Sequence, residues 1–397
     1  MMPQRATTSF AGQTITILVA ASLMLNLTML AALLNAHVML NSDFMAFWSF
    51  PRFIAVHSPG QLYNAAALTA FQQQLYPGFH SFYPYLYPPT LLLALFWLKF
   101  LRFFPAELLW TLLGCFALAG GVRAMFPGKP WAVLAALLAC PAALLCAATG
   151  ETAFFTTALL LAGFACLPKQ PVLAGLWFGL LTLKPQLGVL LPFLLLARGD
   201  WRAILSASAT AMLLNGLSCV VLPANLWALW WHTLPAYQSS YFNAVKALNL
   251  NIIVTPAANL VVLGVSQRAA WIVQAIFGIG MVLLTIWAAR RAPYRLAVAI
   301  TLIATFLAQP HAYAYDSIAA IAALALAMEV LPGPRALALG IMAYLAPWLL
   351  LSPVFHWFLY APLLAACLAT IVALALSAQK SAESGHEPNR LLPPAAT

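Results

Sequence analysis

The sequence has 397 residues, of which 64% are hydrophobic and only 7% are charged, with a mean hydropathy of +0.92. A soluble domain carries about 25% charged residues, so this composition excludes a soluble globular protein and predicts an integral membrane protein. The net charge of +10 does not indicate nucleic-acid binding, because most Lys and Arg residues fall between apolar runs, where they act as topology signals.

The apolar runs are long and do not alternate with polar residues, which predicts spanning helices and not barrel strands. The first run, from about 15 to 34, is too long for a signal peptide and predicts an uncleaved anchor. Thirteen candidate spans occur between residues 14 and 378, and basic residues after position 198 mark cytoplasmic loops. Crossings can be counted forward from a cytoplasmic N-terminus or backward from these cytoplasmic loops. The two counts agree only if one candidate between 88 and 167 does not cross the membrane, and 88–103 is the first suspect. We therefore predict an all-α bundle of about twelve transmembrane helices.

Residues 1–380 are predicted to form one membrane domain, followed by a disordered cytoplasmic tail at 381–397. Two long stretches, 37–87 and 223–268, are predicted to lie outside the membrane on the same outer side. The first is rich in aromatic residues and contains "GQLYNAAALTAFQQQL" (60–75), whose apolar spacing predicts a helix in the membrane interface. The six cysteines lie in apolar stretches without metal-ligand spacing and are interpreted as packing residues. No cofactor is predicted, and no divalent metal is indicated.

Ionisable groups inside membranes are rare and often functional, so the six carboxylates of the membrane body are candidates. They are Asp43, Glu107, Glu151, Asp200, Asp316 and Glu329. Glu107 and Glu329 are predicted near cytoplasmic ends, and Asp200 lies in a loop among arginines, so these three are set aside.

The remaining polar candidates are all predicted on the outer side. They are Asp43 after the first span, Tyr87 in "YPYLYPPT", Glu151 in "GET", Lys184 and Gln186 in "LKPQLG", and His311, Tyr313 and Asp316 in "QPHAYAYD". This shared side is a stronger signal than any single residue.

Each candidate also has a purely structural interpretation. Asp43 and Asp316 could cap the helices that follow them, and Glu151 could complement a helix dipole. Lys184 could extend to the interface, and His311 could be an ordinary interface residue. The sequence leaves these alternatives open.

A carboxylate, a cation at headgroup depth and aromatic walls together suit glycosyl transfer from a lipid phosphate donor. The ammonium of Lys184 would hold the phosphate and stabilise the charge on the leaving group. The carboxylate of Asp43 would take the proton from the acceptor hydroxyl. Aromatic faces would stack on sugar rings.

Several stretches carry a resemblance that covers about residues 40 to 380. They are "SDF" after the first span, "YPYLYPPTLLLAL", the "GET" turn, "AGLWFGLLTLKPQLGVLLPFLLL" and "QPHAYAYD". With these motifs the chain resembles family 87 of the glycosyltransferases, and in particular its bacterial DUF2029 branch. Within "GET", Glu151 stands where relatives usually have Gln.

The resemblance implies a multi-spanning fold of the GT-C class, a periplasm-facing active site in the bacterial inner membrane, and a catalytic aspartate at Asp43. It also implies transfer of a hexose, which is mannose in characterised members, from a polyprenyl-phosphate sugar to a glycan or glycolipid acceptor. Both termini are expected in the cytoplasm. Two other classes are weighed beside it, a secondary transporter or flippase of lipid-linked intermediates and a structural subunit of a larger membrane complex. A site near the midplane would favour the transporter, and a site opening at the outer interface would favour the transferase.

Overall fold

The computed structural model describes residues 16–29, 31, 42–81, 83–235, 253–331, 338, 340–345 and 360–383. These residues form α- and 3₁₀-helices without any strand, and one isolated bridge pairs Ile253 with Tyr313. The all-helical prediction is confirmed for this part of the chain. The predicted tail lies outside the described residues from position 384 onward.

The first half of the described chain contains many short helices. After the helix Thr16–Met29 they are α3 (Phe44–Val56), η1 (Pro59–Tyr63), α4 (Ala65–Leu75), α5 (Thr90–Leu95), η2 (Phe96–Phe100), α6 (Phe103–Met125), α7 (Pro130–Ala139), α8 (Pro141–Thr149), α9 (Ala153–Cys166), α10 (Pro171–Leu180), η3 (Leu181–Leu183), η4 (Pro185–Gly188) and α11 (Leu191–Arg198).

The second half contains the remaining helices. They are α12 (Trp201–Val221), α14 (Pro256–Val262), α15 (Gln267–Arg291), α16 (Tyr294–Ala308), η5 (Ala314–Ser317), α17 (Ile318–Val330) and α19 (Tyr360–Glu383).

Within the described residues, three helices are long and apolar enough to cross a membrane, namely α6, α12 and α15. The pair α7 and α8 makes a fourth candidate span that is bent by 65°. The bend falls at Pro141, which lacks a backbone donor, and Asn26 donates to the carbonyls of Ala139 and Cys140 at 2.9 and 3.1 Å. The membrane class is therefore supported, whereas the predicted count of twelve crossings is not confirmed.

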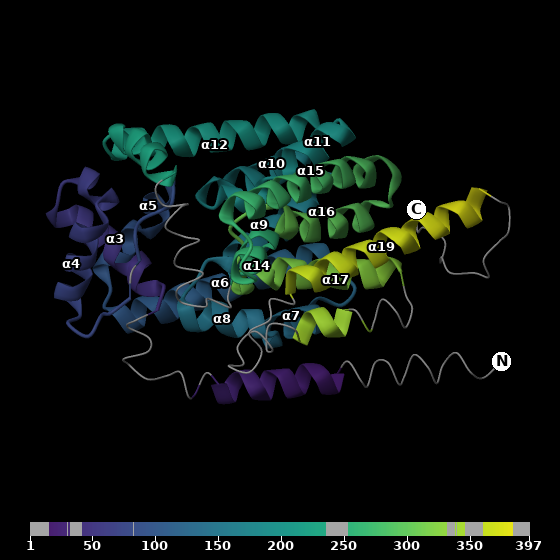
Figure 1. Cartoon of the computed structure of the whole chain (residues 1–397), viewed down its shortest axis with the longest axis horizontal. Helices are drawn as coiled ribbons and strands as arrows, with labels where there is room; N and C mark the ends of the chain where they lie inside the picture. The colour runs from purple at the N-terminus through teal and green to yellow at the C-terminus, as the bar shows by residue number, and fades with distance from the viewer. Residues whose placement is uncertain are drawn as a thin grey trace.

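One end of the bundle is covered by a layer formed by α3, α4, α5 and η2, at the left of Figure 1. Its core is largely aromatic, with Phe47 and Phe50 packed against Tyr87 and Tyr85 at ring separations of 5.6 and 4.8 Å. Arg52 ties the layer together by donating to the carbonyl of Leu98 at 3.0 Å. We call these four elements the end layer.

Two expectations about this region can be checked. The helical structure predicted at 60–75 is present as η1 and α4. The suspect segment 88–103 forms α5 and η2, which pack on α3 in the end layer and are too short for the roughly 20 residues of a crossing.

Glu107 was predicted near a cytoplasmic end, and so at the opposite end of the molecule from Asp43. It lies in the first turns of α6, where Phe103 packs on Phe44 and Trp48 of the end layer at 5.4 and 5.5 Å. Glu107 is therefore at the same end of the molecule as Asp43. The expectation of opposite ends arose because 88–103 was counted as a possible crossing between Asp43 and Glu107, and the structure does not support it.

The opposite end of the bundle carries several ion pairs between basic and acidic side chains. Arg295 at the start of α16 forms an ion pair with Glu329 near the end of α17, and Lys129 reaches the same carboxylate at 3.4 Å. Arg198 pairs with Asp200 at 2.7 Å between α11 and α12. The bundle thus has an end rich in ion pairs with arginine and an end covered by aromatic residues.

Candidate active site

Lys184 lies where two short helical segments meet. The helical segments α10 and η3 end before Lys184, whose backbone has φ −142° and ψ 70°. The next segment, η4, begins at Pro185. A residue before proline avoids the helical region, so the sequence "LKP" itself creates this break. The side chain of Lys184 is only 4% exposed, so the interpretation of Lys184 as a residue that extends to the interface is wrong.

Two buried carboxylates lie beside this lysine. The Nζ of Lys184 donates to Oδ1 of Asp316 at 2.7 Å and lies 3.6 Å from Oε2 of Glu151. These contacts join η5 and the turn before α9 to the break at Lys184, although Asp316 is 132 residues away in the sequence. Asp316 therefore does more than cap a helix, and its Oδ2 has no hydrogen-bond partner within the described residues.

Glu151 follows a left-handed turn at Gly150, which has φ +67° and ends α8. Its Oε2 accepts a hydrogen bond from the backbone N–H of Thr152 at 3.1 Å, next to the start of α9. Glu151 thus interacts with both a helix N-terminus and Lys184, so the dipole interpretation and a role in the site are compatible.

Asp43 stands at the N-cap position of α3, but its side chain makes no capping hydrogen bond. The capping interpretation of Asp43 is therefore wrong. Its carboxylate is hydrogen-bonded to the side chain of Tyr83 and interacts electrostatically with Glu151 and Lys184. Asp43 lies outside the spanning helices, and its apolar surroundings, with Glu151 adding to the effect, raise its pKa to about 7.

Aromatic residues border this group of charges. The ring of Tyr315 has its centroid 5.2 Å from Nζ of Lys184 and is stacked on Tyr313 at 5.1 Å. Tyr87 packs on Phe47 and lines the same cavity as Lys184. The predicted candidates Tyr87 and Tyr313 thus lie next to the charged group.

The other two candidates lie apart from it. His311 is packed beside Trp271 of α15, with ring centroids 6.4 Å apart. Gln186 is in η4, one residue beyond Pro185, and its side chain makes no hydrogen bond within the described part of the chain.

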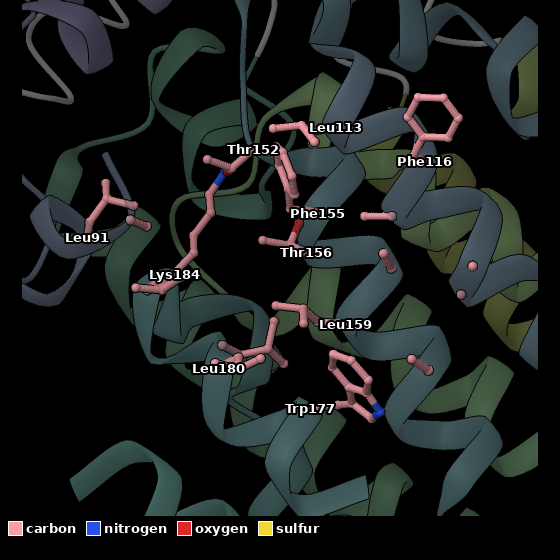
Figure 2. Close-up of a pocket in the computed structure, with 18 of the residues that line it drawn as sticks. Leu91, Leu113, Phe116, Thr152, Phe155, Thr156, Leu159, Trp177, Leu180 and Lys184 are labelled. Carbon is pink, nitrogen blue, oxygen red and sulfur yellow. The ribbon is translucent and has the colours of Figure 1, made fainter. Parts of the chain in front are cut away.

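An apolar cavity of about 720 Å³ begins at Lys184 and runs between α6, α9 and α10. Figure 2 shows Lys184 extending toward Thr152, with Phe155, Thr156 and Leu159 following along α9 and Trp177 at the far end of the labelled residues. Its lining is apolar apart from a few groups, which include Lys184, Thr152 and Thr156. We call this cavity the groove.

Sequence reasoning missed Tyr83, Thr152 and Tyr315 as members of the site. Tyr83 and Tyr315 lie in stretches that the sequence had marked, "YPYLYPPT" and "QPHAYAYD", but nothing in the spacing distinguishes them from Tyr87 and Tyr313. Within the described residues no group of three or more His, Cys, Asp or Glu side chains could hold a metal ion.

The fold and the site define a polytopic helical membrane protein with buried ionisable groups beside a long apolar groove. Residues 85–310 match the family model of glycosyltransferase family 87. Because this match covers more than half of the sequence, the chain belongs to that family. No curated protein and no solved structure matches the chain. The matched region contains Glu151 and Lys184, while Asp43 and Asp316 lie outside it.

Membership of this family indicates glycosyltransferase activity, with a sugar donor and an acceptor as substrates.

Proposed function

We propose that the protein transfers a hexose from a polyprenyl-phosphate sugar to a hydroxyl group of a glycan or glycolipid acceptor. The groove is the observation that carries this proposal. A polyprenyl-phosphate sugar has a long apolar tail, a charged phosphate and a sugar, in that order. The groove has apolar walls along α6, α9 and α10 and reaches Lys184 and Thr152. The carboxylates Glu151 and Asp316 contact Lys184, and Asp43 interacts electrostatically with it.

The chemical step follows from this order. The acceptor oxygen attacks the anomeric carbon, the bond from that carbon to the phosphate oxygen breaks, and the acceptor proton passes to the carboxylate of Asp43. The phosphate leaves with one more negative charge than it had as a diester. A lysine ammonium at this position stabilises that charge as it develops, which is the role we assign to Lys184.

The two carboxylates that contact Lys184, those of Asp316 and Glu151, define its role further. In an apolar site, an isolated ammonium would lose its proton, and Asp316 at 2.7 Å keeps it charged. The free Oδ2 of Asp316 can accept a hydrogen bond from a sugar hydroxyl. Tyr315 and Tyr87 supply aromatic faces for the sugar ring.

The position of the site supports the transferase over the transporter. The η3 segment before Lys184 contacts α5 of the end layer, and α12 contacts α5 as well. The charged group therefore lies between the bundle and the end layer and not among the ion pairs of Arg295 and Arg198 at the other end. By the positive-inside rule the arginine-rich end faces the cytoplasm, which would place the site toward the periplasm in a bacterial inner membrane, with both termini cytoplasmic.

The direct test uses the purified full-length protein in nanodiscs. A panel of polyprenyl-phosphate hexoses, with mannose first, is incubated with glycolipid and glycan acceptors, and release of polyprenyl phosphate is measured. We expect release from at least one donor, dependent on acceptor and lost in Asp43→Asn. Movement of a lipid-linked sugar across vesicle membranes without cleavage of any donor would favour the flippase instead.

A further inference from the structure

Asp43 belongs to a closed ring of residues in the end layer that are linked by hydrogen bonds of their side chains and backbones. Tyr83 bonds to its carboxylate through the phenol side chain. The backbone carbonyl of Tyr83 accepts from Nε2 of Gln72 at 3.4 Å, and the same Nε2 donates to Oγ of Ser49 at 3.0 Å. Ser49 donates to the carbonyl of Ala46 at 3.1 Å.

The backbone N–H of Ala46 donates to the carbonyl of Asp43 at 2.9 Å, which closes the ring. The ring thus joins the start of α3, the middle of α4 and the segment between α4 and α5. Ser49 and Gln72 are both fully buried, so these bonds form where water does not compete.

Gln72 stands in a run of three glutamines on α4, and the next two, Gln73 and Gln74, are exposed. A buried amide in an apolar layer costs free energy unless its hydrogen bonds are made. Packing alone would be served by leucine at this position. Both bonds donated by Nε2 of Gln72 lie in the ring that ends at Asp43, while its Oε1 has no hydrogen-bond partner within the described residues.

The surroundings of Asp43 explain why such a ring is needed. The ionisable groups that act on it are Glu151, Lys184, Tyr83 and Tyr315. Glu151 and the apolar side chains oppose its ionised form, while Lys184 and the bond from Tyr83 favour it. A general base must be ionised and correctly oriented to accept a proton.

We propose that Tyr83 and Gln72 are positioning residues, with Tyr83 orienting the Asp43 carboxylate through its phenol and Gln72 holding Tyr83 in place. This inference rests on the proposed function, because it assigns to Asp43 the role of base. Neither residue has to touch the substrates.

The test compares Tyr83→Phe with Tyr85→Phe in the full-length protein. Tyr85 lies two residues away and its hydroxyl donates to the carbonyl of Pro88 at 2.8 Å, so both changes remove one phenol hydrogen bond from the same segment. In Tyr83→Phe we expect the acid limb of the pH–rate profile to move to higher pH by about one unit. Activity should fall about tenfold on the acid side and return to near the wild-type value at alkaline pH. Tyr85→Phe should leave the position of the limb unchanged.

Gln72→Leu is compared with Gln73→Leu in the same way. Gln72→Leu should lower kcat with little change in donor KM and should move the acid limb in the same direction as Tyr83→Phe. Gln73→Leu, on the exposed face of α4, should match the wild type. A role in packing alone would reduce the amount of folded protein without moving the pH profile.

A second readout does not depend on turnover. Infrared difference spectroscopy follows the protonated carboxyl band of Asp43, assigned by its loss in Asp43→Asn, as the pH is changed. The midpoint should be higher in Tyr83→Phe than in the wild type and in Tyr85→Phe. An unchanged midpoint, or an equal shift in both tyrosine variants, would overturn the proposal. If no donor is turned over by the wild type but the midpoint moves as expected, the hydrogen bond is established and the proposed function fails.

Discussion

Gly150 lies directly against Phe44, the residue that follows Asp43. A Cβ atom built on Gly150 would come within 2.5 Å of Cβ of Phe44, and the backbone of Gly150 is left-handed with φ +67°. This contact fixes the turn that carries Glu151 against the start of α3. The two carboxylates Asp43 and Glu151 are therefore brought together by a position that only glycine can occupy.

Gly150→Ala should disrupt this contact. A left-handed alanine costs about 1–2 kcal/mol, and the clash with Phe44 adds about 1–3 kcal/mol of overpacking. Gly199→Ala is the matched control, because Gly199 has φ +73° but nothing within 4 Å of a built Cβ. Thermal unfolding in detergent should therefore show a clearly larger loss for Gly150→Ala, together with loss of transferase activity. Equal losses of thermal stability in the two variants would mean that Phe44 moves away from the added methyl group without a cost in free energy.

The buried pair of Lys184 and Asp316 leads to a prediction about stability and donor binding. Lys184→Met leaves Asp316 and Glu151 buried without their cation, and breaking a buried ion pair costs about 3–5 kcal/mol. The protein should unfold at a lower temperature, contrary to what an interfacial lysine would predict. Adding Asp316→Asn to Lys184→Met should recover much of the stability, because one buried charge is removed.

The same double variant separates folding from function. Donor affinity, measured with a non-hydrolysable polyprenyl-phosphate analogue, should remain weak in Lys184→Met/Asp316→Asn although the protein is folded. Asp200→Asn serves as the control, because Asp200 pairs with Arg198 at the other end of the bundle and does not contact Lys184. Donor binding by the double variant at the wild-type level would remove Lys184 from the phosphate site.

The sequence predicted the helical membrane class and the helix at 60–75 because both depend on local patterns of apolar residues. It did not determine how 88–103 and Glu107 are placed. Short apolar helices such as α5 have the same composition whether they cross a membrane or pack against an aromatic layer such as that around Phe47 and Phe50. Only the tertiary contacts of α3 and η2 decide between the two.

For the site, the sequence predicted that Asp43, Glu151, Lys184 and Asp316 lie at one end, and the structure brings them together. The break at Lys184 was visible because Pro185 follows it. The pairing of Lys184 with Asp316 could not be predicted, since it depends on how η5 packs against α8 and α9. Tyr83 was missed because the sequence does not show which of several neighbouring tyrosines contacts a carboxylate.

The raised pKa of Asp43 predicts how activity depends on pH. Its carboxyl has a pKa of about 7, so the group is increasingly protonated below pH 7 and cannot accept a proton from the acceptor. We expect kcat/KM to fall about tenfold for each pH unit below 7 and to level off above it. The profile is measured from pH 5 to 9 with folding checked at each pH. Full activity at pH 5 would mean that no group with a pKa near 7 has to be ionised.

Asp43→Asn tests the assignment of the base itself. Asn has the same size as Asp and can still accept a hydrogen bond from Tyr83, so the end layer should fold normally. An amide cannot take the acceptor proton, and loss of a general base costs about 10²–10⁴-fold in rate. We expect a folded variant that binds the lipid donor like the wild type, has a kcat lower by that factor and no longer shows the acid limb near pH 7. Asp200→Asn is the control, because Asp200 pairs with Arg198 at the other end of the bundle and should leave the rate unchanged. If Asp43→Asn turned over within a few-fold of the wild type, the base would have to be sought at Asp316 or Glu151.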